Sequence, residues 1–159
     1  MYGKGLFVTV ASFVIMYAAA SDIGHAAEIE KAEFFVELSD DASAPVYLDT
    51  NVVPLKPDQT CFGWRIKLSS DETLVHVREV LTLPEAPEYW SDEDNVYGTI
   101  EVSSDRKAAT TTRFIPVVDG WVEHSWCVSE GDPTGQCSLD VTIDDLATER
   151  FEFQIVTVE

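Results

Sequence analysis

A regular alternation of apolar and polar residues is the feature that most restricts how this chain can fold. The clearest run covers residues 61–68, in which every second residue is apolar: Phe62, Trp64, Ile66 and Leu68. Successive side chains of a strand point to opposite faces of a sheet, so this period of two indicates a strand with one buried face. The same alternation marks three further segments, at Phe34, Val36 and Leu38, at Leu139, Val141 and Ile143, and at Phe151, Phe153 and Ile155. Because no segment after residue 30 shows helical periodicity, the sequence predicts an all-β protein.

Turn residues divide the chain into about nine candidate strands. Asp119-Gly120 separates two apolar runs, and this pair favours a type I′ hairpin turn, in which both central residues need a positive φ. Residues 103–106 and Asp144-Asp145 indicate two more turns, so we expect the five strands after residue 97 to form an antiparallel succession. Four candidate strands precede them, at residues 31–39, 45–50, 60–69 and 73–82.

Strands in this number, at short spacing and without helices, predict an antiparallel immunoglobulin-like β-sandwich of about 7–9 strands. A closed β-barrel is the alternative. Pro116 falls inside a strand run, so that strand should lie at a sheet edge or carry a bulge, because proline has no N–H to donate. No internal repeat, low-complexity tract or linker appears after residue 27, and we expect residues 28–159 to form a single domain.

The first 27 residues have the pattern of a signal peptide followed by a short leader. Lys4 is the only charged residue before an apolar stretch at residues 6–16, which is long enough for a signal peptide but short for a membrane span. Ala20 ends a run of small residues suited to cleavage, and Ala26 offers a second position. A retained membrane anchor is the alternative. We therefore expect a periplasmic or secreted protein with no stable membrane anchor after cleavage.

Three cysteines permit one disulfide in an oxidising compartment. Cys127 and Cys137 are near each other in sequence and form the first-choice pair. Alternation complicates this pairing, because Cys127 points away from its apolar neighbour whereas Cys137 shares the inward parity of its own strand. Cys61 also points away from its apolar neighbours, so a Cys61–Cys127 disulfide is the alternative.

The charge balance restricts the partners. The chain carries 29 Asp and Glu residues against 10 Lys and Arg, for a formal net charge of -19. Phosphate contacts need clustered Lys and Arg, and the closest approach to such a cluster is Arg106-Lys107, so we expect no nucleic-acid partner. Solubility explains the acidity, and steering of a basic partner is the alternative explanation.

The segment 83–95, LPEAPEYWSDEDN, is the least strand-like long connection and the candidate binding site. Its candidate binding residues are Tyr89, Trp90, Asp92, Glu93 and Asp94. Aromatic side chains are common binding anchors. In the alternative interpretation, the aromatic residues close one end of the sandwich and the acids are solvated. The acids lack the spacing of a calcium-binding loop, so no metal is assigned to them.

No catalytic, cofactor or metal constellation is visible in the sequence. The motifs of serine hydrolases, zinc proteases, P-loop enzymes and dinucleotide-binding proteins are all missing. His124 and Cys127 lie three residues apart, which on a strand places them on opposite faces, so a structural or surface role is favoured over a metal site. We therefore predict no enzyme activity, catalytic residue, cofactor or metal.

The C-terminal stretch WCVSEGDPTGQCSLDVTIDDLATERFEFQIV resembles small exported bacterial immunoglobulin-like domains of unknown function. In those domains a tryptophan-bearing strand, a G-D-P-x-G turn, a further strand and a final F-x-F strand close the sandwich. The resemblance covers Trp121 to Val158 and is looser upstream. It implies a β-sandwich in a periplasmic or secreted setting, and it transfers no active residue.

These observations predict a non-catalytic binding or accessory module of the periplasm or cell surface. Such a module would engage another protein or a cell-envelope component through its loops or a sheet edge. A periplasmic inhibitor or immunity protein, whose acidity blocks a basic enzyme cleft, is the first alternative. The second is a hydrolase or metal protein whose site is assembled from residues far apart in sequence.

Overall fold

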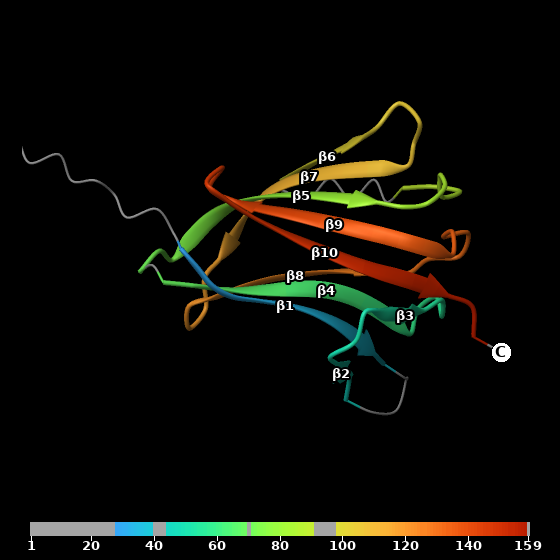
Figure 1. Cartoon of the computed structure of the whole chain (residues 1–159), viewed down its shortest axis with the longest axis horizontal. Coiled ribbons are helices and arrows are strands. Elements are labelled where there is room, and N and C mark those ends of the chain that lie inside the picture. Colours follow the sequence, from blue (N-terminus) through green and yellow to red (C-terminus); the bar gives the residue numbers. More distant parts are fainter. Residues whose placement is uncertain (1–27, 40–43, 70, 91–97, 159) are drawn as a thin grey trace, which may run out of the picture.

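Two β-sheets pack face to face in the computed structural model, which describes residues 28–39, 44–69, 71–90 and 98–158 (Figure 1). These ranges contain ten strands: β1 (Ile29–Leu38), β2 (Val46–Leu48), β3 (Val52–Pro54), β4 (Thr60–Leu68), β5 (Leu74–Thr82), β6 (Gly98–Val102), β7 (Ala108–Pro116), β8 (Trp121–Cys127), β9 (Gly135–Ile143) and β10 (Ala147–Val156). Within the same ranges, no helix has the length and apolar character of a membrane span. The predicted signal peptide and leader, residues 1–27, lie outside the described residues.

The sheet orders define a sandwich of four strands against six. The smaller sheet has the order β2-β1-β4-β8, and the larger has the order β3-β10-β9-β5-β7-β6. Neighbouring strands are antiparallel, except that β3 runs parallel to β10. The predicted all-β sandwich is confirmed, with two separate sheets rather than a closed barrel. The strand missing from the prediction is β3, which at three residues is too short to show a period of two.

The connection between β7 and β8 is a two-residue turn at which the chain changes sheets. Asp119 and Gly120 have φ values of 52° and 80°, as the predicted type I′ turn requires. The flanking Val118 and Trp121 form a single β-bridge, after which β8 pairs with β4 of the other sheet. The expected antiparallel succession is therefore wrong at β8, although β6–β7 and β9–β10 pair as expected. The edge position or bulge expected from Pro116 is wrong, because β7 lies between β5 and β6 with regular pairing; Pro116 instead ends the strand, beyond its pairing with β6.

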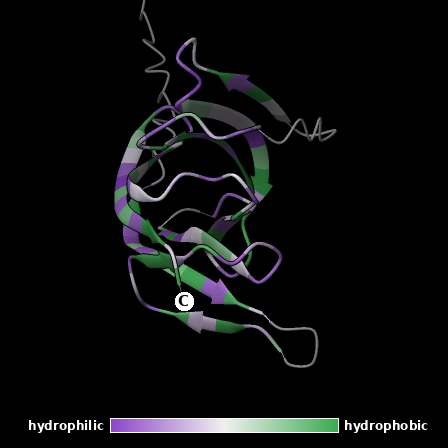
Figure 2. Ribbon diagram, turned by 90° about the vertical axis from the view of Figure 1, so that its right-hand side faces the viewer, coloured by the Kyte–Doolittle hydropathy of each residue, from purple (hydrophilic) through white to green (hydrophobic). Residues whose placement is uncertain are grey.

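The core lies between the sheets and is built from the alternating apolar positions. The apolar residues of β4 that the alternation predicted to face inward are all buried, and Trp64 at the centre of the strand is 0% exposed. From the opposite sheet, the Phe153 ring packs against those of Phe34 and Phe62, with centroids 5.0 and 4.7 Å apart. Figure 2 shows the resulting banding of hydrophobic and hydrophilic residues along the strands. Burial of these side chains is the main force that joins the sheets.

A disulfide joins Cys61 of β4 to Cys127 of β8 on the outer face of the four-stranded sheet. The two residues are direct register partners, and both alternate with inward-facing neighbours. The first-choice prediction, Cys127–Cys137, is wrong. Cys137 lies on β9 of the other sheet, where it is 2% exposed and carries a free thiol. The loop between β8 and β9 carries the chain from one sheet to the other, so nearness in sequence does not bring these two side chains together.

Replacing both disulfide cysteines with serine should destabilise the protein more than replacing Cys137 with alanine. The disulfide spans a sequence separation of 66, which the chain-entropy model equates with about 4 kcal/mol. Burial raises the pKa of the Cys137 thiol to about 11, so iodoacetamide should leave it unmodified in the folded protein at neutral pH. Urea unfolding of the variants and mass spectrometry of the alkylated wild type test both expectations. Equal destabilisation by the two replacements, or alkylation of Cys61 in the folded protein, would contradict the pairing.

Candidate functional site

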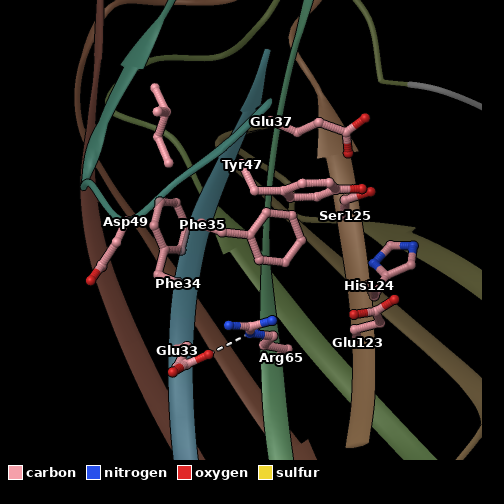
Figure 3. A pocket seen from close by; sticks show the side chains of 11 residues that line it. Glu33, Phe34, Phe35, Glu37, Tyr47, Asp49, Arg65, Glu123, His124 and Ser125 are labelled. Atoms are coloured by element: carbon pink, nitrogen blue, oxygen red, sulfur yellow. Dashed lines mark hydrogen bonds and ion pairs between the residues drawn. The ribbon is translucent and has the colours of Figure 1, made fainter. Parts of the chain in front are cut away.

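An open groove with a volume of about 650 Å³ lies on the outer face of the four-stranded sheet (Figure 3). All four strands contribute to its lining: β1 provides Phe35, β2 provides Tyr47, β4 provides Arg65 and β8 provides Glu123. These residues occupy outward positions, which the register of the sheet aligns in rows across the strands. The groove is therefore formed mainly by the sheet itself, and Asp49 joins the lining from the connection that follows β2.

The floor of the groove depends on Gly63 of β4. Its register partners are Phe35 on β1 and Ser125 on β8, and the three residues form one row across the outer face, here called the Gly63 row. A Cβ atom at Gly63 would lie 2.3 Å from the backbone oxygen of His124 and 2.9 Å from Cζ of Phe35. The Phe35 ring thus covers the space above the glycine. Its own neighbour is the Tyr47 ring, at 5.5 Å between centroids and 65° between ring planes.

Negative charge dominates the groove. Arg65 forms an ion pair with Glu33 and lies 5.2 Å from the centroid of the Trp121 ring. The other acidic lining residues form no ion pair with a described basic residue; they are Glu37, Asp49 and Glu123. The negative charge of Glu37, followed by burial and with a smaller effect of Glu123, raises the pKa of Tyr47 above its usual value. Glu37 and Glu123 therefore both act on the Tyr47 side chain.

Behind this face, a carboxylate is buried between the two sheets. Glu79 of β5 takes an inward position and is 0% exposed. Its Oε1 accepts a hydrogen bond of 2.6 Å from Nε1 of Trp64 in the opposite sheet, and its Oε2 accepts one of 3.0 Å from Oγ1 of Thr111 on β7. Donors from both sheets therefore replace the water that a carboxylate loses on burial.

His124 of β8 and Arg113 of β7 complete the network around this carboxylate. Arg113 Nη1 lies 2.7 Å from His124 Nε2, and because a guanidinium only donates, Nε2 must accept. The ring is then neutral, and its Nδ1 carries the proton and donates to Glu79 Oε1 at 3.1 Å. Burial acts to raise the pKa of Glu79, but the interactions with His124, Trp64 and Arg113 hold it below its usual value of 4.5.

This network, here called the Glu79 network, contacts β4 and β8, which are two of the four strands that line the groove. Trp64 and His124 are register partners on the inner faces of β4 and β8, directly behind the outward-facing residues of the same strands. The Glu79 carboxylate itself has no accessible surface, whereas His124 also lines the groove. Among the described residues, no three His, Cys, Asp or Glu side chains are arranged to hold a metal ion.

Sequence reasoning missed Glu79, although a signal for it was present. The inward positions of β5 read Val75, Val77, Glu79 and Leu81, so the glutamate stands where the alternation requires an apolar residue. The opposite orientations expected for His124 and Cys127 are confirmed, since the histidine joins the Glu79 network and the cysteine forms the disulfide on the outer face. A charged residue at a core position was the available clue.

The two described residues of the predicted binding loop, Tyr89 and Trp90, do not line the groove. Trp90 packs against the core, and its Nε1 donates to the backbone oxygen of Arg106 at 2.9 Å. Tyr89 is 55% exposed. Both line a separate cavity of about 60 Å³, together with Trp126. The acidic members Asp92, Glu93 and Asp94 lie outside the described residues. The structure thus brings Tyr89 and Trp90 together, and their role in binding stays a prediction.

Four strands packed against six around one apolar core define an immunoglobulin-like β-sandwich. A solved immunoglobulin-like protein from Pseudomonas aeruginosa is similar over 82% of this chain and 97% of that chain, with 17% sequence identity and a TM-score of 0.54. The chain belongs to the PM0630 beta sandwich domain family, which matches residues 32–156. The family therefore covers far more of the chain than the C-terminal stretch that resembled such domains.

A second solved structure is similar at a low level. It is an alkylpurine DNA glycosylase from Pseudomonas fluorescens, similar over 78% of this chain and 30% of that chain at 11% identity, with a TM-score of 0.37. No curated protein sequence matches the chain.

Replacing Glu79 with glutamine should destabilise the protein at neutral pH and weaken its response to acid. Removing one partner from a buried charged network costs about 3 kcal/mol, because Arg113 then lacks the charge that it faces. The folded-state pKa of Glu79 lies below the unfolded value, so its stabilising contribution is complete above about pH 4.5 and is lost as the pH falls through the folded-state pKa. Urea unfolding at several pH values should show the advantage of the wild type shrinking below about pH 4.5. A constant advantage down to about pH 2 would contradict this role.

Replacing Gly63 with alanine should destabilise the protein by about 2 kcal/mol, because the new Cβ would overlap backbone that cannot move aside. Ser125→Ala is the matched control in the same row, and its exposed side chain should tolerate the change within about 0.5 kcal/mol. Thermal and urea unfolding of both variants measure the difference. Equal stability of the two variants would show that β4 and β8 do not approach as closely as described.

Proposed function

We propose that this protein is an exported, non-catalytic binding module of the periplasm or cell surface, and that the groove is its binding surface for another protein. The observation that carries the proposal is the combination of an open volume of about 650 Å³ with aromatic side chains and unpaired carboxylates on a rigid sheet. Apolar surface with a few placed polar groups is the usual composition of a binding site. The strands beneath it are held by the disulfide and by the Glu79 network.

The rim of the groove supports binding of a macromolecule. β2 is an edge strand of the four-stranded sheet, and its residues Val46, Tyr47 and Leu48 are 54%, 61% and 38% exposed. Adjacent large apolar residues on an exposed edge are an aggregation hazard unless they serve recognition. A partner can cover them and add a strand to the same edge.

Two observations support export. The first is the signal-peptide pattern of residues 1–27. The second is the Cys61–Cys127 disulfide, a bond that persists in oxidising compartments and is rare in the reducing cytosol. Both agree with the periplasmic or secreted setting that the sequence predicts.

A periplasmic inhibitor or immunity protein is the second candidate function. The unpaired carboxylates Glu37, Asp49 and Glu123 favour it, because an acidic groove can cover a basic enzyme surface. The two functions differ in their response to salt. Binding of an inhibitor dominated by charge should weaken steeply as ionic strength rises, whereas binding through aromatic contacts should change little.

Capture of partners from envelope extract tests which surface binds. Three exposed aromatic residues on different surfaces provide a matched set: Tyr47, Tyr89 and Phe114 are 61%, 55% and 56% exposed. With the full-length chain as bait, Tyr47→Ala should lower recovery of a specific partner by at least about fivefold, while Phe114→Ala on the six-stranded sheet should stay within about twofold. Recovery that depends on Tyr89 and not on Tyr47 would transfer the function to the loop at residues 83–95. Recovery that is indifferent to Tyr47 would contradict the groove as the binding surface.

A further inference from the structure

We infer that the groove binds the cationic side chain of a lysine or arginine presented by another polypeptide, seated against the rings of Phe35 and Tyr47 and facing Glu37 and Glu123. This inference rests on the proposed function, because it names the chemistry by which the same surface recognises its partner. Three features of the outer face support the inference. Carboxylates there form no ion pair with a described basic residue, two aromatic rings border the same space, and a nearby arginine is already held by a carboxylate and an aromatic ring.

The carboxylates surround the centre of the groove from opposite sides. Glu37 on β1 and Glu123 on β8 stand in the two rows that flank the Gly63 row. Neither carboxylate forms an ion pair with a described basic residue. A cation bound in the groove would supply opposite charge to these carboxylates. The negative charge of Glu37, and to a smaller extent that of Glu123, also raises the pKa of the Tyr47 hydroxyl, so both carboxylates act on the same side chain.

Aromatic faces adjoin these carboxylates. Figure 3 shows the Phe35 and Tyr47 rings side by side, with Glu37 next to Tyr47 and Glu123 across the groove on β8. The ring planes are inclined by 65°, so the two rings border the space from different directions. A cation over an aromatic face is attracted by the ring quadrupole, and an adjacent carboxylate adds to that attraction.

The same face already holds one cation in this way. Arg65 pairs with the Glu33 carboxylate and lies 5.2 Å from the centroid of the Trp121 ring. A carboxylate and an aromatic ring thus hold a guanidinium within the sheet. Glu37 and Tyr47 repeat this pair of groups at the other end of the groove, where no described residue supplies the cation.

The rim of the groove favours a cation that belongs to a polypeptide over a free ion. The groove opens beside β2, whose exposed residues Val46 and Leu48 offer apolar contact to the neighbours of the inserted residue. Among the described strands β2 pairs only with β1, so its second edge is open to an extended segment. A free inorganic cation would use neither the rings nor this edge.

Peptide probes test the chemistry directly. The blocked peptide Ac-Gly-Ser-Arg-Ser-Gly-NH₂ is titrated into the isotope-labelled protein, and amide shifts are followed by NMR. The matched probe carries citrulline in place of arginine, which keeps the shape and removes the charge. We expect shifts concentrated at residues 35, 47 and 123–125, and an affinity for the arginine peptide at least about fivefold above that for the citrulline peptide. Equal affinities, or shifts spread over both sheets, would overturn the inference.

Variants separate the groove from the overall charge of the protein. Glu37→Gln/Glu123→Gln should weaken binding of the arginine peptide by about tenfold. Glu72→Gln/Glu101→Gln removes the same two charges from exposed positions outside the lining, and it should change binding by less than about twofold. Tyr47→Leu keeps apolar bulk but removes the ring, and it should weaken binding by about threefold. Equal weakening by the two charge variants, or no effect of Tyr47→Leu, would overturn the inference.

Failure of this inference and failure of the proposed function give different results. If Tyr47→Ala abolishes partner capture while the two peptides bind equally, the groove is the binding surface, and the inference that it recognises a cationic side chain is wrong. If the arginine peptide binds in the groove while partner capture ignores Tyr47, the cation site stands and the proposed function is wrong.

Discussion

The buried carboxylate of Glu79 is the interaction on which the arrangement of this sandwich depends. Moving a charged group out of water is unfavourable unless hydrogen bonds and opposite charge compensate for it. Here the compensation comes from Trp64 and His124 of the four-stranded sheet and from Thr111 and Arg113 of the six-stranded sheet. An apolar core tolerates many small shifts of one sheet over the other. A carboxylate that needs donors from both sheets does not, so Glu79 selects one relative placement.

That constraint matters most for β8, because backbone pairing alone attaches this strand on one side. It is an edge strand that pairs only with β4 among the described strands, and it follows a turn held by one bridge. Two further links attach it. On the inner face His124 binds Glu79, and on the outer face Cys127 is bonded to Cys61. These two links hold the outer positions of β4 and β8 in place, so the proposed binding would not have to order the floor of the groove.

The sequence predicts the layers of this fold better than the pairing within them. Alternation is a local property, so it identifies the inward residues of β4, such as Trp64, without knowledge of their neighbours. Pairing is not local. The sheet to which β8 belongs, and with it the choice of Cys61 over Cys137 as the partner of Cys127, depends on where the chain goes after the Asp119-Gly120 turn. The turn type was predictable from its residues. After the single β-bridge, however, the chain can either continue to pair with β7 or cross to the other sheet, and the local sequence does not decide between them.

The candidate site was beyond sequence reasoning for a related reason. Aromatic and acidic residues crowd together in the segment 83–95, and a search for clusters along the sequence finds them there. The groove draws its residues from four strands, of which β1 and β8 are far apart in sequence and become close only through β4. Gly63 shows the difficulty most clearly. As a residue of a strand it looks like a weak point, and only the register reveals that Phe35 and the backbone of β8 occupy the space above it.

The distribution of charged residues over the outer face makes the groove negatively charged. The basic residues Lys31, Arg65 and Lys67 gather near the start of β1, and each pairs with a carboxylate there. Glu33 pairs with two of these cations, whereas Glu123, the register partner of Arg65, forms no ion pair with a described basic residue. Toward the end of β1 the basic residues stop while the acids continue, at Glu37 on the sheet face. If acidity served solubility alone, carboxylates dispersed over the surface would suffice. Three carboxylates that form no ion pair with a described basic residue instead gather around two aromatic rings, and this concentration of negative charge is the reason for proposing a cationic partner.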